Sequence, residues 1–400
     1  MIGCARSEVL PAVNYRRAFC LVLDSLGVGA LPDAPRFGDA GANTLAHIAD
    51  AVGGLDLPVL SSLGLGKLAA VRGLASPEVP RAAYGRCAEL SAGKDTSSGH
   101  WEMMGQPVAR AFATFPQGFP AEILEPFCRA AGVPAVLGNV AASGTEILER
   151  LGPEHERTGL PIVYTSADSV FQIAAHLERV PLERLYAWCE AARKILDPHR
   201  VGRVIARPFR GRVGAYQRTY DRRDYSMLPP GPTWLDRLQD AGVPTIGVGK
   251  IEDIFAGQGL TRSIHTEGNR DGMAATVGLA SELEHGFVFV NLVDFDMLYG
   301  HRRDAHGYAR ALAEFDVDLE FLLGALRPDD LLLLTADHGN DPLHGGTDHT
   351  REYVPLLATD GRSSLRGDLG IRSSFADVGA TIGAAFDVPA RGLPGRSLWS

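Results

Sequence analysis

The chain lacks any long apolar segment. Its hydrophobic runs all fall well short of the roughly 20 residues that a membrane-spanning helix needs, so no transmembrane helix is expected. The N-terminal stretch also lacks the pattern of a signal peptide, since Arg6 and Glu8 interrupt it and its apolar run, residues 9–13, is short. We therefore expect a cytoplasmic protein in which residues 1–16 form an extension to which we assign no role.

Cysteine is scarce and forms no metal-binding or redox motif. The five cysteines are Cys4, Cys20, Cys87, Cys128 and Cys189. Their number is odd, and no pair has the spacing of a CxxC motif or of a zinc knuckle. We expect free, reduced thiols, which is the usual state of cysteine in the cytosol.

The chain has no excess of positive charge. Its 39 lysines and arginines are outnumbered by 48 acidic residues, for a net charge of -9. Nucleic acids and anionic membranes are bound by basic surfaces, so this balance argues against both as partners. A local group of basic residues can still bind a small phosphate. The composition is otherwise that of an ordinary globular protein, and 400 residues are enough for two or three domains.

Four apolar runs end at residues that can bind ions or phosphate. They cover residues 19–23, 245–248, 287–293 and 331–334, and they precede Asp24, Gly249 with Lys250, Asp294 with Asp296, and Asp337 with His338. Because the runs are apolar throughout, they predict strands covered on both faces, as in parallel sheets. The carboxyl ends of such strands are where open α/β sheets bind ligands. A helical stripe also occurs, formed by Leu312, Phe315, Leu319, Leu322 and Leu326.

The middle of the chain differs from the rest. Between about Ala113 and Pro230 it contains none of these polar motifs, but it has strand-like runs of its own and a helical segment at residues 182–195. Segments rich in proline and glycine, residues 115–120 and 229–232, bracket it. We expect residues 113–230 to form an inserted domain within a discontinuous core of residues 17–112 and 231–400.

Aspartate and histidine recur at the predicted strand ends and in the loops that follow. Six of them are candidate metal ligands: Asp24, Asp296, His301, Asp337, His338 and His349. Any one alone is more often a turn carboxylate or a solvated imidazole. Together they favour a centre for two divalent ions, and mixed carboxylate and imidazole ligands suit manganese, zinc or iron better than calcium.

A polar loop bracketed by Gly93 and Gly99 offers three hydroxyls, those of Thr96, Ser97 and Ser98. It could be a plain surface loop, and spacing does not choose among the three as a nucleophile. Candidate phosphate-binding cations are Arg203, Arg207, Arg218 and Lys250, although each alone is more often a solvated charge. Ser166 and Asp168 follow a predicted strand in the insert, where they could equally cap a helix.

Several segments closely resemble the prokaryotic phosphopentomutase family, which is of the alkaline-phosphatase type. The matching residues are Asp24-Ser25 with Gly27-Val28-Gly29 and Pro32-Asp33-Ala34, Gly93 to Thr96 with Gly99 to Glu102, Tyr164 to Val170, Gly202 to Phe209, Asn291 to Asp296, Gly300 to Asp304, Thr335 to Pro342 and Thr347 to Glu352. The likeness covers nearly the whole chain after about Arg17. It implies a doubly wound α/β core of the alkaline-phosphatase type with a smaller inserted α/β cap domain.

The resemblance also implies roles for individual residues. One manganese ion would be bound by Asp24, Asp337 and His338 together with the nucleophile, and a second by Asp296, His301 and His349. Thr96 would be the nucleophile, which removes the choice among the three hydroxyls. The sugar-phosphate pocket would comprise Ser166, Asp168, Arg203, Ile205, Arg218 and Lys250.

The activity implied is the interconversion of ribose 1-phosphate and ribose 5-phosphate, and of their 2-deoxy equivalents, in nucleoside salvage and catabolism. The route would pass through a phosphothreonine enzyme and a 1,5-bisphosphate. Glucose 1,6-bisphosphate or ribose 1,5-bisphosphate would act as activator, the other partners would be small sugar phosphates, and we expect a monomer. The alternative is a metal-dependent phosphatase or phosphodiesterase of the same superfamily.

Overall fold

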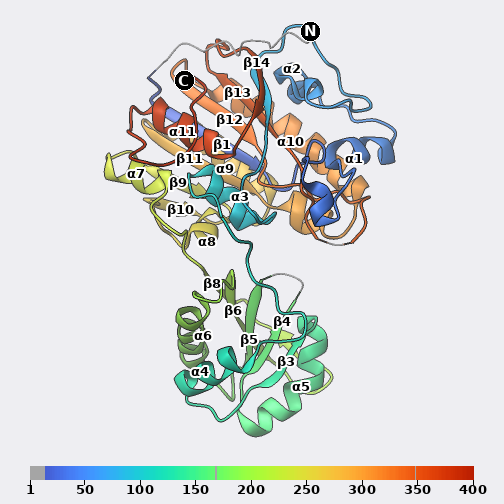
Figure 1. The fold of residues 1–400 in the computed structure, drawn as a ribbon, viewed down its shortest axis with the longest axis vertical. Helices are drawn as coiled ribbons and strands as arrows, with labels where there is room; N and C mark the ends of the chain where they lie inside the picture. The colour runs from blue at the N-terminus through green and yellow to red at the C-terminus, as the bar shows by residue number, and fades with distance from the viewer. Residues whose placement is uncertain (1–13, 167–168, 347) are drawn as a thin grey trace. The chain divides into compact units, whose positions relative to one another are not determined.

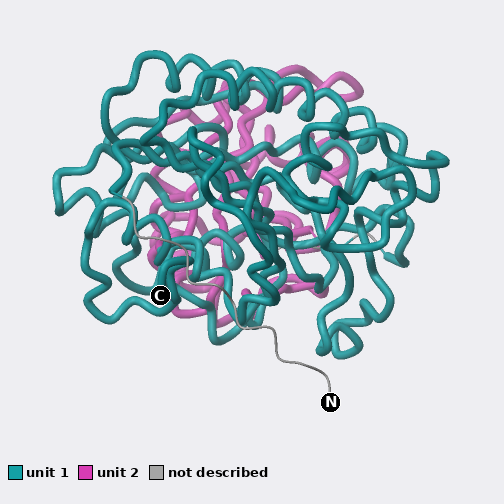
Figure 2. The backbone as a smooth tube through the Cα atoms, turned by 90° about the horizontal axis from the view of Figure 1, so that it is seen from above, with its two compact units in different colours: residues 1–111, 229–400 teal, residues 112–228 magenta. Residues whose placement is uncertain are grey.

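The computed structural model describes residues 14–166, 169–346 and 348–400, which form two compact units (Figures 1 and 2). Unit 1 comprises Met1–Ala111 and Pro229–Ser400, and unit 2 comprises Phe112–Leu228. Unit 2 is therefore a continuous segment that interrupts the sequence of unit 1.

Unit 1 is built on an eight-stranded sheet in the order β10-β9-β11-β1-β12-β13-β2-β14. The strands are β1 (Arg17–Leu23), β2 (Ala83–Cys87), β9 (Thr245–Val248), β10 (Arg262–Ile264), β11 (Gly286–Leu292), β12 (Asp330–Thr335), β13 (Val354–Asp360) and β14 (Gly367–Arg372). Only β13 runs antiparallel to its neighbours among these strands. The four apolar runs are confirmed as parallel strands, since β1, β9, β11 and β12 pair in parallel and are buried along their whole length.

Helices cover both faces of this sheet (Figure 1). One group comprises α1 (Thr44–Val52), α2 (Pro58–Leu63), α9 (Asn269–Glu282) and α10 (Ala305–Ala325), and the other comprises α3 (Thr96–Met103), α7 (Trp234–Asp240), α8 (Ile251–Phe255) and α11 (Ala376–Ala385). Short helical turns lie at Ala34–Phe37, Leu65–Lys67 and Phe295–Gly300. The predicted stripe lies in α10, where its first four members are buried and Leu326 is the residue that ends the helix.

The amino-terminal edge of the sheet is held by a buried ion pair. Arg17 begins β1 and Asp330 begins β12, and the guanidinium binds both carboxylate oxygens. Arg17 Nη1 also donates to the carbonyl oxygens of Ala280 and Leu283, at 2.5 and 2.9 Å. Neither side chain of the pair is exposed, so each charge depends on the other for its compensation.

Unit 2 has a six-stranded sheet in the order β3-β4-β5-β6-β7, with β8 also paired to β6. Its elements are β3 (Leu137–Ala141), β4 (Ile162–Thr165), β5 (Val170–His176), β6 (Arg203–Arg210), β7 (Gln217–Arg218), β8 (Arg223–Ser226), α4 (Ala121–Ala131), α5 (Gly144–Thr158) and α6 (Leu182–Leu196). Helices α4 and α6 bury one face around Phe127, Phe171 and Trp188, and α5 packs on the other against Tyr164 and Phe209.

Within the described residues, no helix combines the length and the apolar character that a bilayer crossing requires. Cys20, Cys87, Cys128 and Cys189 are free thiols, and all but Cys128 are buried. Cys4 lies outside the described residues.

Candidate active site

Three neighbouring parallel strands bring acidic residues to one edge of the unit 1 sheet. Asp24 follows β1, Asp337 and His338 follow β12, and Asp296 follows β11 in the short helix Phe295–Gly300. Since β11, β1 and β12 are adjacent and parallel, their carboxyl ends meet. The four side chains are almost completely buried there.

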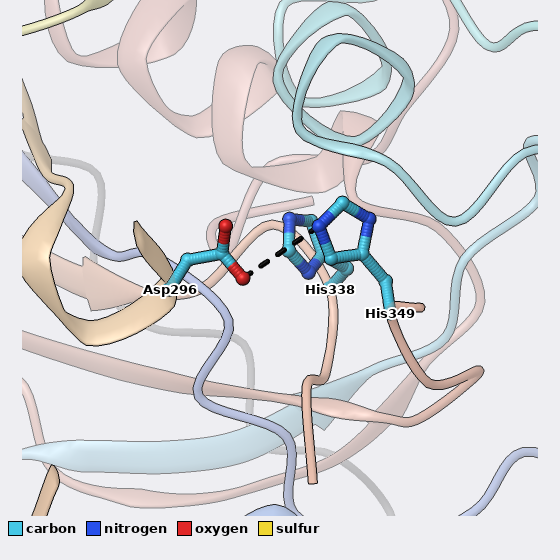
Figure 3. A group of neighbouring side chains, drawn as sticks. All are labelled: Asp296, His338 and His349. Atoms are coloured by element: carbon cyan, nitrogen blue, oxygen red, sulfur yellow. Dashed lines mark ion pairs between the residues drawn. The ribbon is translucent and has the colours of Figure 1, made fainter. Parts of the chain in front are cut away.

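Two groups of side chains at this edge could each bind a metal ion. One is Asp24, Asp337 and His338, and the other is Asp296, His338 and His349, with the ligand atoms of each group within 4.8 Å of one another. Figure 3 shows the second group, in which the Asp296 carboxylate points toward both imidazoles. His338 Nε2 lies 3.5 Å from Asp24 Oδ1 and 3.4 Å from Asp337 Oδ2, and His349 Nε2 lies 3.6 Å from Asp296 Oδ1. His338 therefore belongs to both groups.

His301 joins the second group through an unusual backbone turn. Phe295–Gly300 is a π-helix, and the His301 amide donates to the Asp296 carbonyl five residues back, at 3.0 Å. As a result, His301 Nε2 lies 3.1 Å from Asp296 Oδ2 and 3.2 Å from His349 Nε2. The structure thus brings all six predicted metal ligands to one place.

The carboxylates at this edge have shifted pKa values. Burial, together with Asp337 and Asp296, raises the pKa of Asp24 to about 8, against a lowering by Lys250. Burial also acts to raise the pKa of Asp296, but His349 and His301 outweigh it and hold that pKa well below its usual value. Asp24 Oδ1 is buried and accepts no hydrogen bond from the described residues, and Asp337 Oδ2 is buried with two imidazole nitrogens beside it, His100 Nδ1 at 3.2 Å and His338 Nε2 at 3.4 Å. Buried oxygens of this kind, beside imidazoles, form a donor set that fits divalent cations.

Further residues orient these side chains. Asn291, near the carboxyl end of β11, donates from Nδ2 to Asp24 Oδ2 at 2.8 Å, and Asn340 donates likewise to Asp296 Oδ1 at 2.7 Å. His100 is buried with Nδ1 3.2 Å from Asp337 Oδ2 and 2.9 Å from the Thr96 carbonyl oxygen. None of these three was predicted as a site residue from the sequence. The available signal for Asn291 was one polar amide within an otherwise apolar run.

Of the three candidate hydroxyls, only that of Thr96 has a contact with a candidate metal ligand among the described residues. It is the first residue of α3, and its Oγ1 lies 3.2 Å from His338 Nε2. The Ser98 hydroxyl is instead buried and donates to Asp95, the N-cap residue, at 2.7 Å. No hydrogen bond from Ser97 to the metal-binding groups occurs in the described part of the chain. This geometry favours Thr96 over Ser98 as the reactive hydroxyl.

The predicted pocket residues lie in both units. Lys250 caps α8 in unit 1, and its charge acts on Asp24 as described above. In unit 2, Arg203 and Ile205 lie on β6, Arg218 lies on β7, and Ser166 follows β4. Asp168 lies outside the described residues.

Unit 2 gathers three arginines near the Asp224 carboxylate, and a fourth, Arg218, near one of the three. Arg222 binds both oxygens of Asp224 at 2.8 Å, and Arg203 Nη1 lies 3.7 Å from Asp224 Oδ2. Burial lowers the pKa of Arg207 to about 10, with further lowering by Arg222 and Arg218. A Cβ placed on Gly144, the first residue of α5, would overlap the Arg218 guanidinium. The four arginines, Arg203, Arg207, Arg218 and Arg222, are hereafter called the arginine cluster, and with this helix N-terminus they are suited to bind an anion.

Known proteins resemble the chain in fold and in sequence. Its fold is similar to that of the phosphoglycerate mutase of Leishmania mexicana, crystallised at low cobalt concentration, with a TM-score of 0.50 at 13% identity over 97% of this chain and 98% of the other. The Metalloenzyme superfamily model matches residues 16–390. The phosphopentomutases of Anaeromyxobacter dehalogenans (strain 2CP-C) and Symbiobacterium thermophilum are 59% and 54% identical, each over 94% of this chain and 96% of the relative. The chain belongs to the phosphopentomutase family.

Membership in the phosphopentomutase family makes the chain an isomerase of the mutase type, within a superfamily of divalent-metal-dependent enzymes. The predicted α/β fold of the alkaline-phosphatase type is confirmed. The phosphatase or phosphodiesterase that the sequence left open is not favoured, because relatives at 53–60% identity are named phosphopentomutase.

Proposed function

We propose that this phosphopentomutase interconverts α-D-ribose 1-phosphate and D-ribose 5-phosphate, and the 2-deoxyribose equivalents, through a phosphothreonine at residue 96. The observation that carries the proposal is the Thr96 hydroxyl, 3.2 Å from an imidazole that belongs to both candidate metal-binding groups. A hydroxyl placed at such a centre is a candidate nucleophile toward phosphorus.

Two manganese ions are the proposed metals. Asp24, Asp337 and His338 would bind one, and Asp296, His301 and His349 the other. When bound, a pair of divalent cations stabilises the negative charge of the entering and leaving oxygens during phosphoryl transfer. Two observations support this assignment: Asp24 Oδ1 is buried without a hydrogen-bond donor among the described residues, and both groups combine buried carboxylates with imidazoles.

The reaction consists of two transfers. In the first, the C1 hydroxyl oxygen of ribose 5-phosphate bonds to the phosphorus of phosphothreonine 96, the bond from that phosphorus to Thr96 Oγ1 breaks, and the proton of the sugar hydroxyl ends on Oγ1. In the second, the 1,5-bisphosphate presents its other phosphate: Thr96 Oγ1 bonds to the 5-phosphorus, the bond from that phosphorus to the sugar O5 breaks, and the Thr96 proton ends on O5, which leaves ribose 1-phosphate. The enzyme ends phosphorylated, as it began, and the same steps run in reverse.

The phosphate that is not being transferred needs its own cations. We assign it to Arg203, Arg218 and Lys250, with Ser166, Asp168 and Ile205 around the sugar. The arginine cluster supports this assignment, because Arg222 and Arg218 both lower the pKa of Arg207, as expected where positive charges crowd together, and a bound phosphate would relieve their repulsion. Unit 2 acts in this proposal as the substrate-binding cap, which excludes water from the phosphothreonine.

The unphosphorylated enzyme would be primed by a sugar bisphosphate, either glucose 1,6-bisphosphate or ribose 1,5-bisphosphate. We place the enzyme in the cytoplasm as a monomer that serves nucleoside salvage and catabolism.

Intact mass spectrometry before and after incubation with Mn²⁺ and glucose 1,6-bisphosphate tests the proposal. We expect the gain of one phosphoryl group, mapped to Thr96, and isomerisation of ribose 5-phosphate. Rapid release of phosphate from a generic aryl phosphate, without isomerisation, would contradict it.

A further inference from the structure

The segment that leads into the nucleophile has no regular structure of its own. Glu89 to Gly93 connects β2 to the turn before α3, and Thr96 follows three residues later. Glu89 and Ser91 are buried. Buried backbone N–H and C=O groups outside a helix or sheet need other partners, and two charged side chains supply them here.

Arg351 binds the carbonyl oxygens of this segment. Its Nη1 donates to the carbonyls of Ser91 and Gly93 at 2.7 and 2.9 Å, and its Nη2 donates to that of Glu89 at 2.9 Å. Nη1 also binds the Glu89 carboxylate at 2.7 Å. The guanidinium is almost fully buried, at 4% exposed, and its remaining hydrogen bonds go to Asp33.

Glu102 binds the amides of the same segment. Its carboxylate accepts hydrogen bonds from the Leu90 amide at 3.0 Å and from the Ser91 amide and hydroxyl, both at 2.6 Å. It also accepts from the Ser374 hydroxyl at 2.8 Å and the Phe375 amide at 3.0 Å. Because donors face both oxygens, an amide NH₂ in either position would meet another donor.

Arg351 also connects this segment to the loop that contains His349. It lies two residues after His349, and its own amide donates to Asp39 at 2.8 Å while its carbonyl accepts from Leu31 at 3.0 Å. Arg351 therefore connects two segments: its own backbone is held near His349, and its side chain holds the backbone of the segment that precedes Thr96.

We propose that Arg351 and Glu102 are positioning residues, which hold the 89–93 segment by its carbonyls and amides so that the Thr96 hydroxyl stays at the metal centre. Neither residue touches the reacting atoms. The inference rests on the proposed function, in which Thr96 is the nucleophile. Displacement of a reacting group by about 1 Å can cost roughly 100-fold in rate, so a clamp of this kind affects catalysis without forming part of the chemistry.

The test compares matched variants of the full-length enzyme. Arg351→Lys keeps the positive charge but loses the planar guanidinium group that binds several acceptors at once. Arg17→Lys is its control. It makes the same change at a buried arginine that binds one carboxylate and two carbonyl oxygens at the opposite edge of the sheet. Glu102→Gln is paired with Asp316→Asn, which alters a buried carboxylate that accepts from the Val59 and Leu60 amides. The measurements are kcat, the KM for ribose 5-phosphate, bound manganese, and the rate at which glucose 1,6-bisphosphate phosphorylates Thr96.

We expect Arg351→Lys and Glu102→Gln each to lower kcat and the rate of Thr96 phosphorylation by roughly 100-fold, with manganese content and KM nearly unchanged. Arg17→Lys and Asp316→Asn should lower the melting temperature and leave kcat within a small factor of the wild type.

If wild-type Thr96 is phosphorylated but both test variants behave like their controls, or lose their manganese, the clamp is overturned and the proposed function stands. Phosphorylation of the wild type at another residue would overturn the proposed nucleophile and the clamp with it. Should Arg351→Lys fail to fold, Glu102→Gln decides the matter by the same readouts.

Discussion

Thr96 Oγ1 lies 3.2 Å from His338 Nε2, although 242 positions separate the two residues in the chain. Thr96 opens α3, whose N-cap Asp95 fixes the first turn, and His338 follows the buried strand β12. His338 Nε2 also lies 3.5 Å from Asp24 and belongs to both candidate metal-binding groups. One imidazole therefore connects the candidate nucleophile with both groups.

Removal of the Thr96 hydroxyl is expected to abolish turnover without loss of fold. The side chain is partly exposed and makes no core packing, so Thr96→Ala should lower kcat by at least about 1,000-fold while the melting temperature changes little. Mutase assays and mass spectrometry after incubation with glucose 1,6-bisphosphate would measure the effect. Ser97→Ala is the matched control and should retain activity. Substantial turnover in Thr96→Ala would move the nucleophile to a neighbouring serine.

Loss of a metal ligand is expected to lower both metal content and rate. Asp337→Asn and His349→Ala each remove a donor from a buried group, and the loss of metal affinity should exceed the about 10–100-fold typical of a residue that only orients a ligand. Asn340→Ala provides that comparison, because Asn340 donates to Asp296 and accepts from Arg303 but belongs to neither metal-binding group. Chelation should inactivate the wild type, and Mn²⁺ should restore it. Full metal occupancy in both ligand variants, by elemental analysis, would show that the assignment is wrong.

Much of this architecture could be predicted from local sequence patterns. Apolar residue type alone was enough to predict the strands β1, β9, β11 and β12 and the stripe of α10, because the apolar side chains of these segments are buried in the structure. The order of strands in the sheet could not be predicted, because it results from pairing between segments hundreds of residues apart. The same holds for the sharing of His338 between two groups and for the π-helix that aligns His301 with Asp296.

Individual charged side chains were the least predictable part of the site. Arg351 and Glu102 are ordinary charged residues in sequence, and only long-range hydrogen bonds to the 89–93 segment reveal what they bind. The choice between Thr96 and Ser98 is of the same kind, since it depends on the capping bond that occupies the Ser98 hydroxyl. Spacing along the chain carries no information about which donor meets which acceptor.

The buried ion pair between Arg17 and Asp330 is expected to matter for stability. Asp330→Ala leaves the guanidinium buried and uncompensated, which should cost about 3–5 kcal/mol of unfolding free energy. Glu284→Ala removes the carboxylate of an exposed pair with Arg327 and should cost at most about 1 kcal/mol. Urea unfolding followed by fluorescence compares the two. Equal effects would mean that the buried pair contributes no more than a surface contact.

Arg207 is expected to contribute to phosphate binding in unit 2. Replacement of Arg207 by methionine keeps much of the side-chain volume and removes the positive charge. Arg222 and Arg218 repel that charge and so lower the pKa of Arg207. If a phosphate compensates this cluster, the loss of a charged hydrogen bond worth about 1.5–3 kcal/mol should raise the KM for ribose 5-phosphate about 10–100-fold. Arg210→Met, at the exposed end of the same strand, should leave KM unchanged. A KM unaffected by Arg207→Met would show that Arg207 does not contribute to phosphate binding.

Lys250 provides the test of what separates a mutase from a phosphatase. Phosphothreonine 96 can pass its phosphoryl group either to a sugar hydroxyl or to water, and tight binding of the sugar phosphate favours the sugar. Lys250 and Arg203 are the proposed phosphate anchors, and removing a desolvated cation of this kind should cost roughly 2–5 kcal/mol. In Lys250→Ala we expect isomerisation to fall steeply while hydrolysis of the phosphothreonine persists in the presence of substrate.

The measurement is the ratio of inorganic phosphate released to sugar phosphate isomerised, starting from enzyme phosphorylated at Thr96. The ratio should rise in Lys250→Ala and in Arg203→Ala, because both lose acceptor binding but keep the metal ligands and Thr96. Lys67→Ala, which alters an exposed lysine of unit 1, is the control and should leave the ratio at the wild-type value. A slower reaction with an unchanged ratio in both test variants would mean that these cations assist the transfer itself and do not decide which acceptor receives the phosphoryl group.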